Sequence, residues 1–289
     1  MHTASVPGRS EYVSTGDCRL HVRVAGAEDA PPVVLLHGFP EFWYGWHRQM
    51  DALADAGYRV LVPDQRGYNL SDRPAEQRAY RVERLVDDVT GLLDATGHDS
   101  AAVVGHDWGA MVAWVLAQDH PERVERLGIL NVPHPAAFEE TLRSNWEQVF
   151  RSWYAGFFQV PRLPELAMRA RDYGLLERTL TGSSHRGTFS EDDLRRYRTA
   201  WGREGALTGM LNWYRANGLG SGLFDRDRRI EPETLLLWGA DDVALVEENA
   251  RRSLEYCDDG SLEVFEQASH WLQHERSREV SERLVDFLE

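Results

Sequence analysis

Short runs of consecutive apolar residues, each closed by glycine or a polar residue, constrain this chain most. Unlike half-exposed strands, they do not alternate in polarity, which is typical of parallel strands covered by helices on both faces. Segments with apolar residues three and four positions apart, such as Tyr80–Thr96, separate them. The sequence therefore predicts an α/β fold with a doubly wound, mostly parallel sheet. The runs are Val33–Gly38, Arg59–Asp64, Ala101–Asp107, Arg126–Asn131 and Thr234–Gly239.

Three further segments extend this pattern at the ends of the chain. Arg19–Gly26 alternates between apolar and polar residues, which predicts an exposed antiparallel strand. Ser261–Glu266 predicts a last strand, and Arg276–Glu289 has the periodicity of an amphipathic helix.

The alternation of strands and helices is interrupted in the middle of the sequence. Residues 136–229 contain no clear buried strand and instead show helical periodicity rich in tryptophan, tyrosine and arginine. We therefore expect a core whose first part is 1–135 and whose second part is 230–289, with 136–229 as an inserted helical cap.

Composition excludes several classes of function. The 289 residues carry a formal net charge of -15, which disfavours a nucleic-acid partner. The chain has no lysine, so it can form neither a lysine Schiff base with pyridoxal phosphate nor a Walker A loop. Cys18 and Cys257 lack metal-ligand spacing and indicate a reducing compartment. We expect no metal and no cofactor.

The sequence also favours a cytoplasmic location. Residues 1–12 lack the basic and then apolar pattern of a secretory leader. No apolar run approaches the ~20 residues that a membrane span needs. We expect a soluble protein without a membrane partner, either a monomer or a homodimer.

Asp107 stands in an unusual place, between Gly105 and Gly109 where a buried strand turns into a helix. The segment Gly105–Gly109 has the form of the G-x-S-x-G nucleophile elbow, with aspartate in place of serine. The alternative is that Asp107 caps the helix, a role for which aspartate is well suited.

Three other segments favour the catalytic interpretation. His37–Pro40 follows an early strand, where this fold forms half of its oxyanion hole, although an ordinary tight turn would look the same. The backbone N–H groups of Phe39 and Trp108 would then face one oxygen. A carboxylate after a late strand and His270 after the last one complete the chain order of this fold's triad.

Five motifs in this order resemble the soluble epoxide hydrolases of the α/β-hydrolase superfamily, from about residue 10 to the C-terminus. The resemblance implies an eight-stranded, mostly parallel sheet with an inserted cap, and the addition of water to an epoxide to give a vicinal diol. Asn69 departs from the family, which often has glycine there. The motifs are HGFPEFWYGW, DQRGYNLSDRP, GHDWGA, WGADD and SHWLQHE.

An aspartate nucleophile displaces a leaving group at a saturated carbon and becomes an alkyl ester, which water must then hydrolyse. His270 is the expected base, oriented by a carboxylate. Asp242 and Asp241 are both candidates, and the family pattern favours Asp242. His270 and His274 also have the spacing of a helical metal pair, but the glutamate that completes that motif is missing.

Epoxide opening also needs a proton donor, and Tyr154 and Tyr214 resemble the family's acid tyrosines. The alternative for any tyrosine is a place in the core, which we expect for Tyr173 and Tyr197. We expect a small apolar epoxide as the substrate, in a pocket that aromatic residues help to line, although such residues more often serve packing. The pocket candidates are His37, Pro40, Trp43, Trp153 and Trp213.

Two other functions remain open. A haloalkane or haloacid dehalogenase would use the same nucleophile, with Trp108 as a halide donor. The sequence departs from haloalkane dehalogenases at Phe39, where they commonly have asparagine, and from fluoroacetate dehalogenases at Trp108, where they have arginine. A non-catalytic ligand receptor on the same fold is the third possibility.

Overall fold

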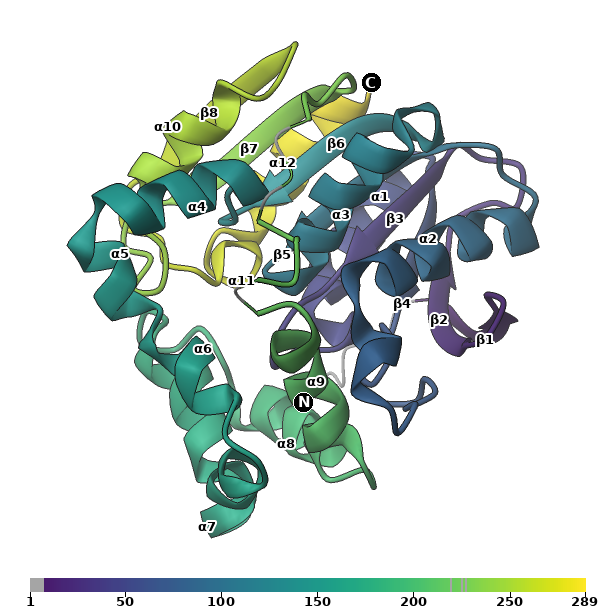
Figure 1. Ribbon diagram of the computed structural model, residues 1–289. Coiled ribbons are helices and arrows are strands. Elements are labelled where there is room, and N and C mark those ends of the chain that lie inside the picture. Colours follow the sequence, from purple (N-terminus) through teal and green to yellow (C-terminus); the bar gives the residue numbers. More distant parts are fainter. Residues whose placement is uncertain (1–7, 219, 225, 227) are drawn as a thin grey trace.

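One sheet of eight strands forms the centre of the protein, in the order β1-β2-β4-β3-β5-β6-β7-β8 (Figure 1). Pairs β1–β2 and β2–β4 are antiparallel, and every other pair is parallel. This confirms the predicted fold class. The computed structural model describes residues 8–218, 220–224, 226 and 228–289. Residues 1–7, part of the N-terminal segment that lacks the pattern of a secretory leader, lie outside the described residues. The strands are β1 Arg9–Ser14, β2 Arg19–Ala25, β3 Pro32–Leu36, β4 Arg59–Pro63, β5 Ala101–His106, β6 Val124–Leu130, β7 Glu233–Gly239 and β8 Gly260–Phe265.

Helices cover both faces of this sheet, as the continuous apolar runs predict. Helix α1 (His47–Asp55) packs against α12 (Ser277–Leu288) on one face, whereas α2 (Val82–Thr96) packs against α3 (Trp108–Asp119) on the other (Figure 1). Strands β4 and β5 are consequently buried at every residue. Burial on both faces removes the need for polar residues along these strands.

The prediction for β2 is half wrong. The strand is antiparallel, but five of its seven residues are buried because β1 covers its outer edge. Its polar side chains are buried with partners: the His21 Nδ1 lies 2.7 Å from Oδ2 of Asp64, and Arg23 donates to Oγ of Ser10 at 2.8 Å. In β2, the alternating polar residues His21 and Arg23 are therefore buried and hydrogen-bonded and are not exposed to solvent.

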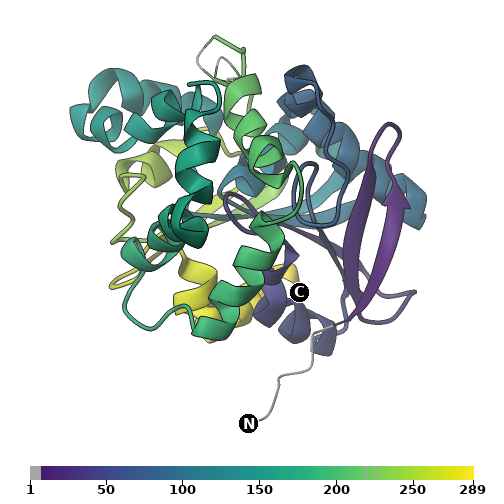
Figure 2. The ribbon, with the colours of Figure 1, turned by 90° about the horizontal axis from the view of Figure 1, so that it is seen from below.

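Among the described residues, six helices lie between β6 and β7, and they begin at Pro135, one residue before the segment predicted to be helical. The first of them, α4, packs against α10 (Glu248–Leu254), whereas the others lie beyond the carboxyl ends of the strands (Figures 1 and 2). The exact division into core and cap at 136 and 229 stays a prediction. The six are α4 Pro135–Ser144, α5 Trp146–Arg151, α6 Trp153–Phe158, α7 Leu163–Gly182, α8 Glu191–Trp201 and α9 Ala206–Ala216.

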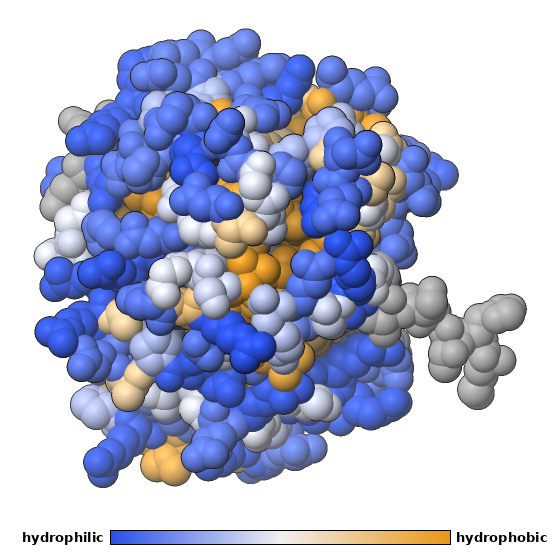
Figure 3. All heavy atoms as spheres, turned by 90° about the vertical axis from the view of Figure 1, so that its right-hand side faces the viewer, coloured by the Kyte–Doolittle hydropathy of each residue, from blue (hydrophilic) through white to orange (hydrophobic). Residues whose placement is uncertain are grey.

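Short helices complete the described chain, namely η1 Trp43–Trp46, η2 Gln77–Tyr80, η3 Pro121–Arg123 and α11 Leu272–Glu275. The face on the right-hand side of Figure 1 is mostly hydrophilic, with a few apolar residues visible near its middle (Figure 3). Among the helices of the described residues, none combines the length and the apolar character needed to cross a membrane.

We expect Gly109→Ala to destabilise the fold, because the added Cβ would lie 2.1 Å from the backbone oxygen of Leu36. The free energy of unfolding should fall by about 2 kcal/mol, as is typical when a packed core is overfilled. Urea unfolding monitored by circular dichroism measures it. Gly156→Ala is the matched control: it meets no atom within 4 Å and lies in a helix, so it should not destabilise. Equal stability of the two variants would contradict the packing argument.

Candidate active site

Asp107 occupies a strained turn between β5 and α3, with φ 51° and ψ −127°. Such backbone angles are costly for a residue other than glycine and occur preferentially at functional sites. The flanking glycines make the turn possible: a Cβ on Gly105 would lie 2.5 Å from Cα of Ala110. The side chain of Asp107 makes no capping hydrogen bond, so the helix-cap alternative is wrong. The turn instead presents the carboxylate to a cavity.

The loop after β3 brings a backbone amide to this carboxylate. The Phe39 N–H donates to Oδ1 of Asp107 at 2.5 Å. A Cβ on Gly38 would lie 2.2 Å from the same oxygen and 2.6 Å from the backbone nitrogen of Trp108, so only glycine fits there. The two amides predicted for an oxyanion hole thus lie beside Asp107.

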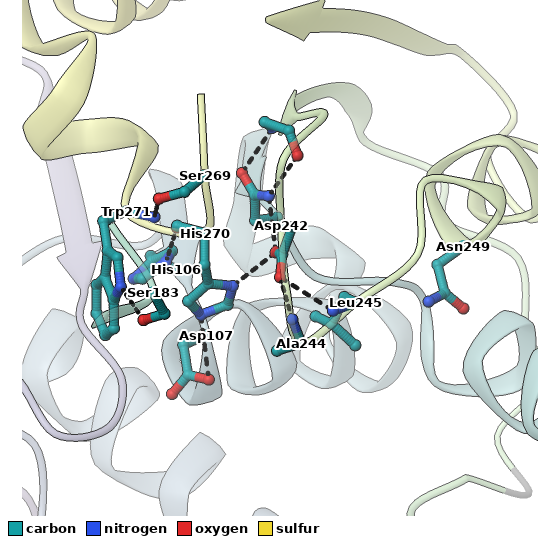
Figure 4. A network of polar contacts seen from close by, with 12 residues as sticks. His106, Asp107, Ser183, Asp242, Ala244, Leu245, Asn249, Ser269, His270 and Trp271 are labelled. Atoms are coloured by element: carbon teal, nitrogen blue, oxygen red, sulfur yellow. Dashed lines mark hydrogen bonds and ion pairs between the residues drawn. The ribbon is translucent and has the colours of Figure 1, made fainter. Parts of the chain in front are cut away.

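A second carboxylate, that of Asp242, is buried beside the imidazole of His270 (Figure 4). Oδ2 of Asp242 lies 2.7 Å from Nδ1 of His270 and accepts a hydrogen bond of 2.9 Å from the Asn131 side chain. Oδ1 accepts from the backbone N–H groups of Ala244 and Leu245 at 2.7 and 2.9 Å. Burial acts to raise the pKa of Asp242, but the charge of His270 and these hydrogen bonds lower it below its ordinary value. Asp242 therefore stays ionised in the interior.

The structure separates Asp242 from its rival. The Asp241 side chain is 52% exposed, and its Oδ2 pairs with Nε2 of His185 at 3.2 Å. His274, the other half of the possible metal pair, places Nε2 2.6 Å from Oε1 of Glu41. Since His270 and His274 engage different carboxylates, their four-residue spacing does not bring them to one site.

His270 lies between two acids, because its Nε2 also lies 3.7 Å from Oδ2 of Asp107 (Figure 4). Burial alone would lower its pKa, but the charge of Asp242, its hydrogen bond to the ring and the nearby charge of Asp107 outweigh burial and raise the pKa to about 10. In the resting enzyme the imidazole is consequently protonated at neutral pH. If Asp107 lost its charge, the pKa of His270 would therefore be raised less.

A buried cluster around Glu41, which we did not predict, joins the inserted helices to the segment that follows His270. Glu41 accepts hydrogen bonds from Tyr197 Oη at 2.5 Å and from Gln273 Nε2 at 2.9 Å, in addition to its contact with His274. Burial acts to raise the pKa of Glu41, but His274 and His106 hold it well below its ordinary value. Because Tyr197 belongs to α8, this carboxylate fastens the inserted helices to the core.

The two tyrosines expected to act as acids approach Asp107 from α6 and α9. The rings of Tyr154 and Tyr214 are 6.1 Å apart and nearly perpendicular, and both line the cavity that Asp107 reaches. Burial and then the charge of Asp107 raise the pKa of each phenol above its ordinary value. Both hydroxyls therefore stay protonated at neutral pH and can donate a hydrogen bond.

The cavity itself has a volume of about 930 Å³. Of the pocket residues predicted, Trp153 lines it, with 69% of its surface exposed. The sequence did not indicate the other apolar residues of its wall, because only the folded insert brings them together. They include Met111, Val132, Phe138, Leu142, Val149, Phe224 and Leu245.

Four predicted pocket residues, namely His37, Pro40, Trp43 and Trp213, are not among the described residues that line this cavity. All four are buried in the core. His37 Nε2 accepts from the backbone N–H of Gln65 at 3.0 Å, and Trp213 Nε1 donates to a backbone carbonyl at 2.9 Å. The polar atoms of His37 and Trp213 thus bind backbone groups of neighbouring loops, and a pocket role for the four residues stays a prediction.

Known proteins share this architecture. The α/β-hydrolase fold family matches residues 31–277. The chain belongs to this family. It is 42% identical over 280 residues to the AB hydrolase superfamily protein YfhM of Bacillus subtilis, with 97% of this chain and 98% of that protein covered.

Proteins named epoxide hydrolases are among the similar ones, in agreement with the five sequence motifs. Epoxide hydrolase A of Mycobacterium tuberculosis is 34% identical, with 96% of each chain covered. The crystal structure of an epoxide hydrolase of Bacillus megaterium in complex with an inhibitor superposes with a TM-score of 0.87 at 29% identity, covering 96% of this chain and 99% of that one. The predicted membership of the epoxide hydrolase family is confirmed.

Removal of either neighbouring charge should lower the pKa of His270 from about 10. We expect a larger decrease for Asp242→Asn than for Asp107→Asn, because the first oxygen lies 2.7 Å from the ring and the second 3.7 Å. NMR titration of the ¹⁵N-labelled imidazole measures both. Asp241→Asn is the control and should leave the value unchanged. A titration that responds to Asp241 and not to Asp242 would refute the assignment.

Proposed function

We propose that this protein hydrolyses epoxides to vicinal diols through a covalent ester on Asp107. One observation carries the proposal: a carboxylate on a strained turn shares a cavity with two protonated phenols and lies 3.7 Å from an imidazole. Epoxide hydrolysis needs all three groups. The carboxylate attacks a ring carbon while a phenol protonates the ring oxygen, and the imidazole then activates water against the ester. The epoxide hydrolases among the relatives support the same reaction.

The first step opens the ring. Phe39 holds Oδ1 of Asp107, which leaves Oδ2 to attack a ring carbon. A carbon–oxygen ester bond forms as the carbon–oxygen bond of the ring breaks. Tyr154 or Tyr214 donates a hydrogen bond and then a proton to the departing oxygen, which therefore does not leave as a free alkoxide. The product of the step is a hydroxyalkyl ester.

The second step hydrolyses the ester, and the charge lost in the first step enables it. Esterified Asp107 is neutral, so one of the two charges that raise the pKa of His270 is absent. His270 then gives up its proton, which returns to the tyrosinate left by the first step, and the neutral imidazole accepts a proton from water, while Asp242 stabilises the resulting imidazolium. Water attacks the ester carbonyl, and the Phe39 and Trp108 amides stabilise the negative charge that develops on Oδ1. Collapse returns the carboxylate and releases the diol.

A single turnover in water enriched in ¹⁸O tests this route. We expect unlabelled diol in the first turnover and label in the peptide that contains Asp107, because water attacks the ester carbonyl and not the epoxide. Mass spectrometry of product and peptide measures both. Label in the first diol molecules would exclude the ester. Release of halide from haloalkanes without epoxide turnover would instead establish the dehalogenase.

The rate of ester hydrolysis should decrease at acid pH, because protonated His270 cannot accept a proton from water. The inflection should lie below pH 10, since the ester lacks the charge of Asp107 that raises the pKa in the resting enzyme. Rapid-quench measurement of the decay of the ester over pH 5–10 gives this profile. His270→Gln should accumulate the ester at every pH, and Asp241→Asn should retain the original profile. Faster decay toward acid pH would contradict the role of His270.

A further inference from the structure

The wall of the cavity has a charge opposite to that of the protein. The chain carries a net charge of -15, yet three arginines line the cavity. Among the described lining residues, Asp107 supplies the only acidic side chain. The arginines are Arg78, Arg81 and Arg215. An excess of guanidinium groups around a substrate cavity favours an anionic group on the ligand.

These arginines come from one side of the cavity. Arg78 belongs to η2, which packs against α9, and Arg215 lies near the end of α9. Arg81 directly precedes α2. The wall formed by α4–α6, in contrast, is largely apolar, with Phe138, Leu142 and Val149.

The three guanidinium groups differ in their availability. Nη1 of Arg215 is held 2.7 Å from Oε1 of Glu165, and Nε of Arg78 lies 2.6 Å from Oε2 of Glu76. Arg81 is exposed and forms no ion pair with any residue that the structure describes. Arg81 is therefore the cation most available to a ligand, and Arg78 can assist it at the cost of an exposed ion pair.

The size of the cavity points in the same direction. At about 930 Å³ it lies near the upper end of the range of about 300–1,000 Å³ common for drug-sized ligands. The smallest epoxides would leave most of this volume to water. A molecule that fills it must extend well beyond the reacting ring, along walls that are apolar on one side and cationic on the other.

We propose that the substrate is an extended apolar epoxide with an anionic group, which Arg81 binds with help from Arg78. This proposal rests on the proposed epoxide hydrolysis. It commits to a carboxylate as the anion, and it replaces the small neutral epoxide expected from the sequence. The carboxylate lies away from Asp107, because two anions in the same part of the cavity would repel each other. The contact with Arg81 thus selects the substrate and places its epoxide at the nucleophile.

Two matched substrates test the proposal, namely 10,11-epoxyundecanoic acid and its N-methylamide, which differ only in charge. The measurement is the ratio of kcat/KM for the acid to kcat/KM for the amide. Arg81→Gln should lower this ratio about fivefold, the scale of one exposed ion pair. Arg81→Lys should keep most of it, and the double variant Arg78→Gln/Arg81→Gln should lower it further. Arg186→Gln, an exposed arginine outside this cavity, is the control and should not change it.

Salt gives an independent check, because screening weakens an exposed ion pair. Raising NaCl from about 0.05 to 0.5 M should lower the ratio for the unmodified enzyme but have little effect on Arg81→Gln. A ratio that is unchanged in Arg81→Gln and in the double variant would overturn the proposal while leaving epoxide hydrolysis intact. If the unmodified enzyme hydrolyses neither substrate, the proposed function itself fails in this assay, and this inference fails with it.

Discussion

The burial of one imidazole between two carboxylates is the constraint on which the site depends. A charged group in the protein interior is stable only when it is paired and hydrogen-bonded, and Asp242 satisfies this through His270, Asn131 and two backbone amides. These partners lie in three loops at the same edge of the sheet: Asn131 follows β6, the two amides follow β7, and His270 follows β8. The parallel strands provide that edge, because β5, β6 and β7 end side by side.

The electrostatics also relate the two steps of the proposed reaction. The charges of Asp242 and Asp107 both contribute to the raised pKa of His270. In the proposed route, ester formation neutralises Asp107 and so favours loss of the proton from the imidazole, which can then act as a base. In this route Asp107 is the nucleophile, and its charge also affects the protonation of the histidine that later hydrolyses its ester. Glu41 holds the inserted helices by a similar buried pairing with His274 and Tyr197.

Sequence patterns predicted the parts of the structure that depend on order and periodicity. Continuous apolar runs indicated strands covered on both faces, and the chain order of Asp107, Asp242 and His270 predicted residues that the fold brings together. The pattern was insufficient at β2, where buried His21 and Arg23 look like exposed polar residues until their partners are known.

Pocket residues were harder to predict for the same reason. His37 and Trp213 flank catalytic motifs, but nearness in sequence does not say which way a side chain points, and both point into the core. Asn131 and Glu41 were missed, although one follows a predicted strand and the other follows Pro40 in a quoted motif. Their importance depends on a partner more than a hundred residues away, Asp242 for the first and His274 for the second.

The position of the helical insert has a consequence for synthesis of the protein. Asp107 and the Phe39 amide precede α4, whereas Asp242 and His270 follow α9. Domains begin to fold while the ribosome is still adding residues. On the proposed mechanism, a nascent chain that ends at α9 would hold the carboxylate of Asp107 but not His270, so any ester formed that early would persist. Complete turnover becomes possible only when β7 and β8 have joined the sheet.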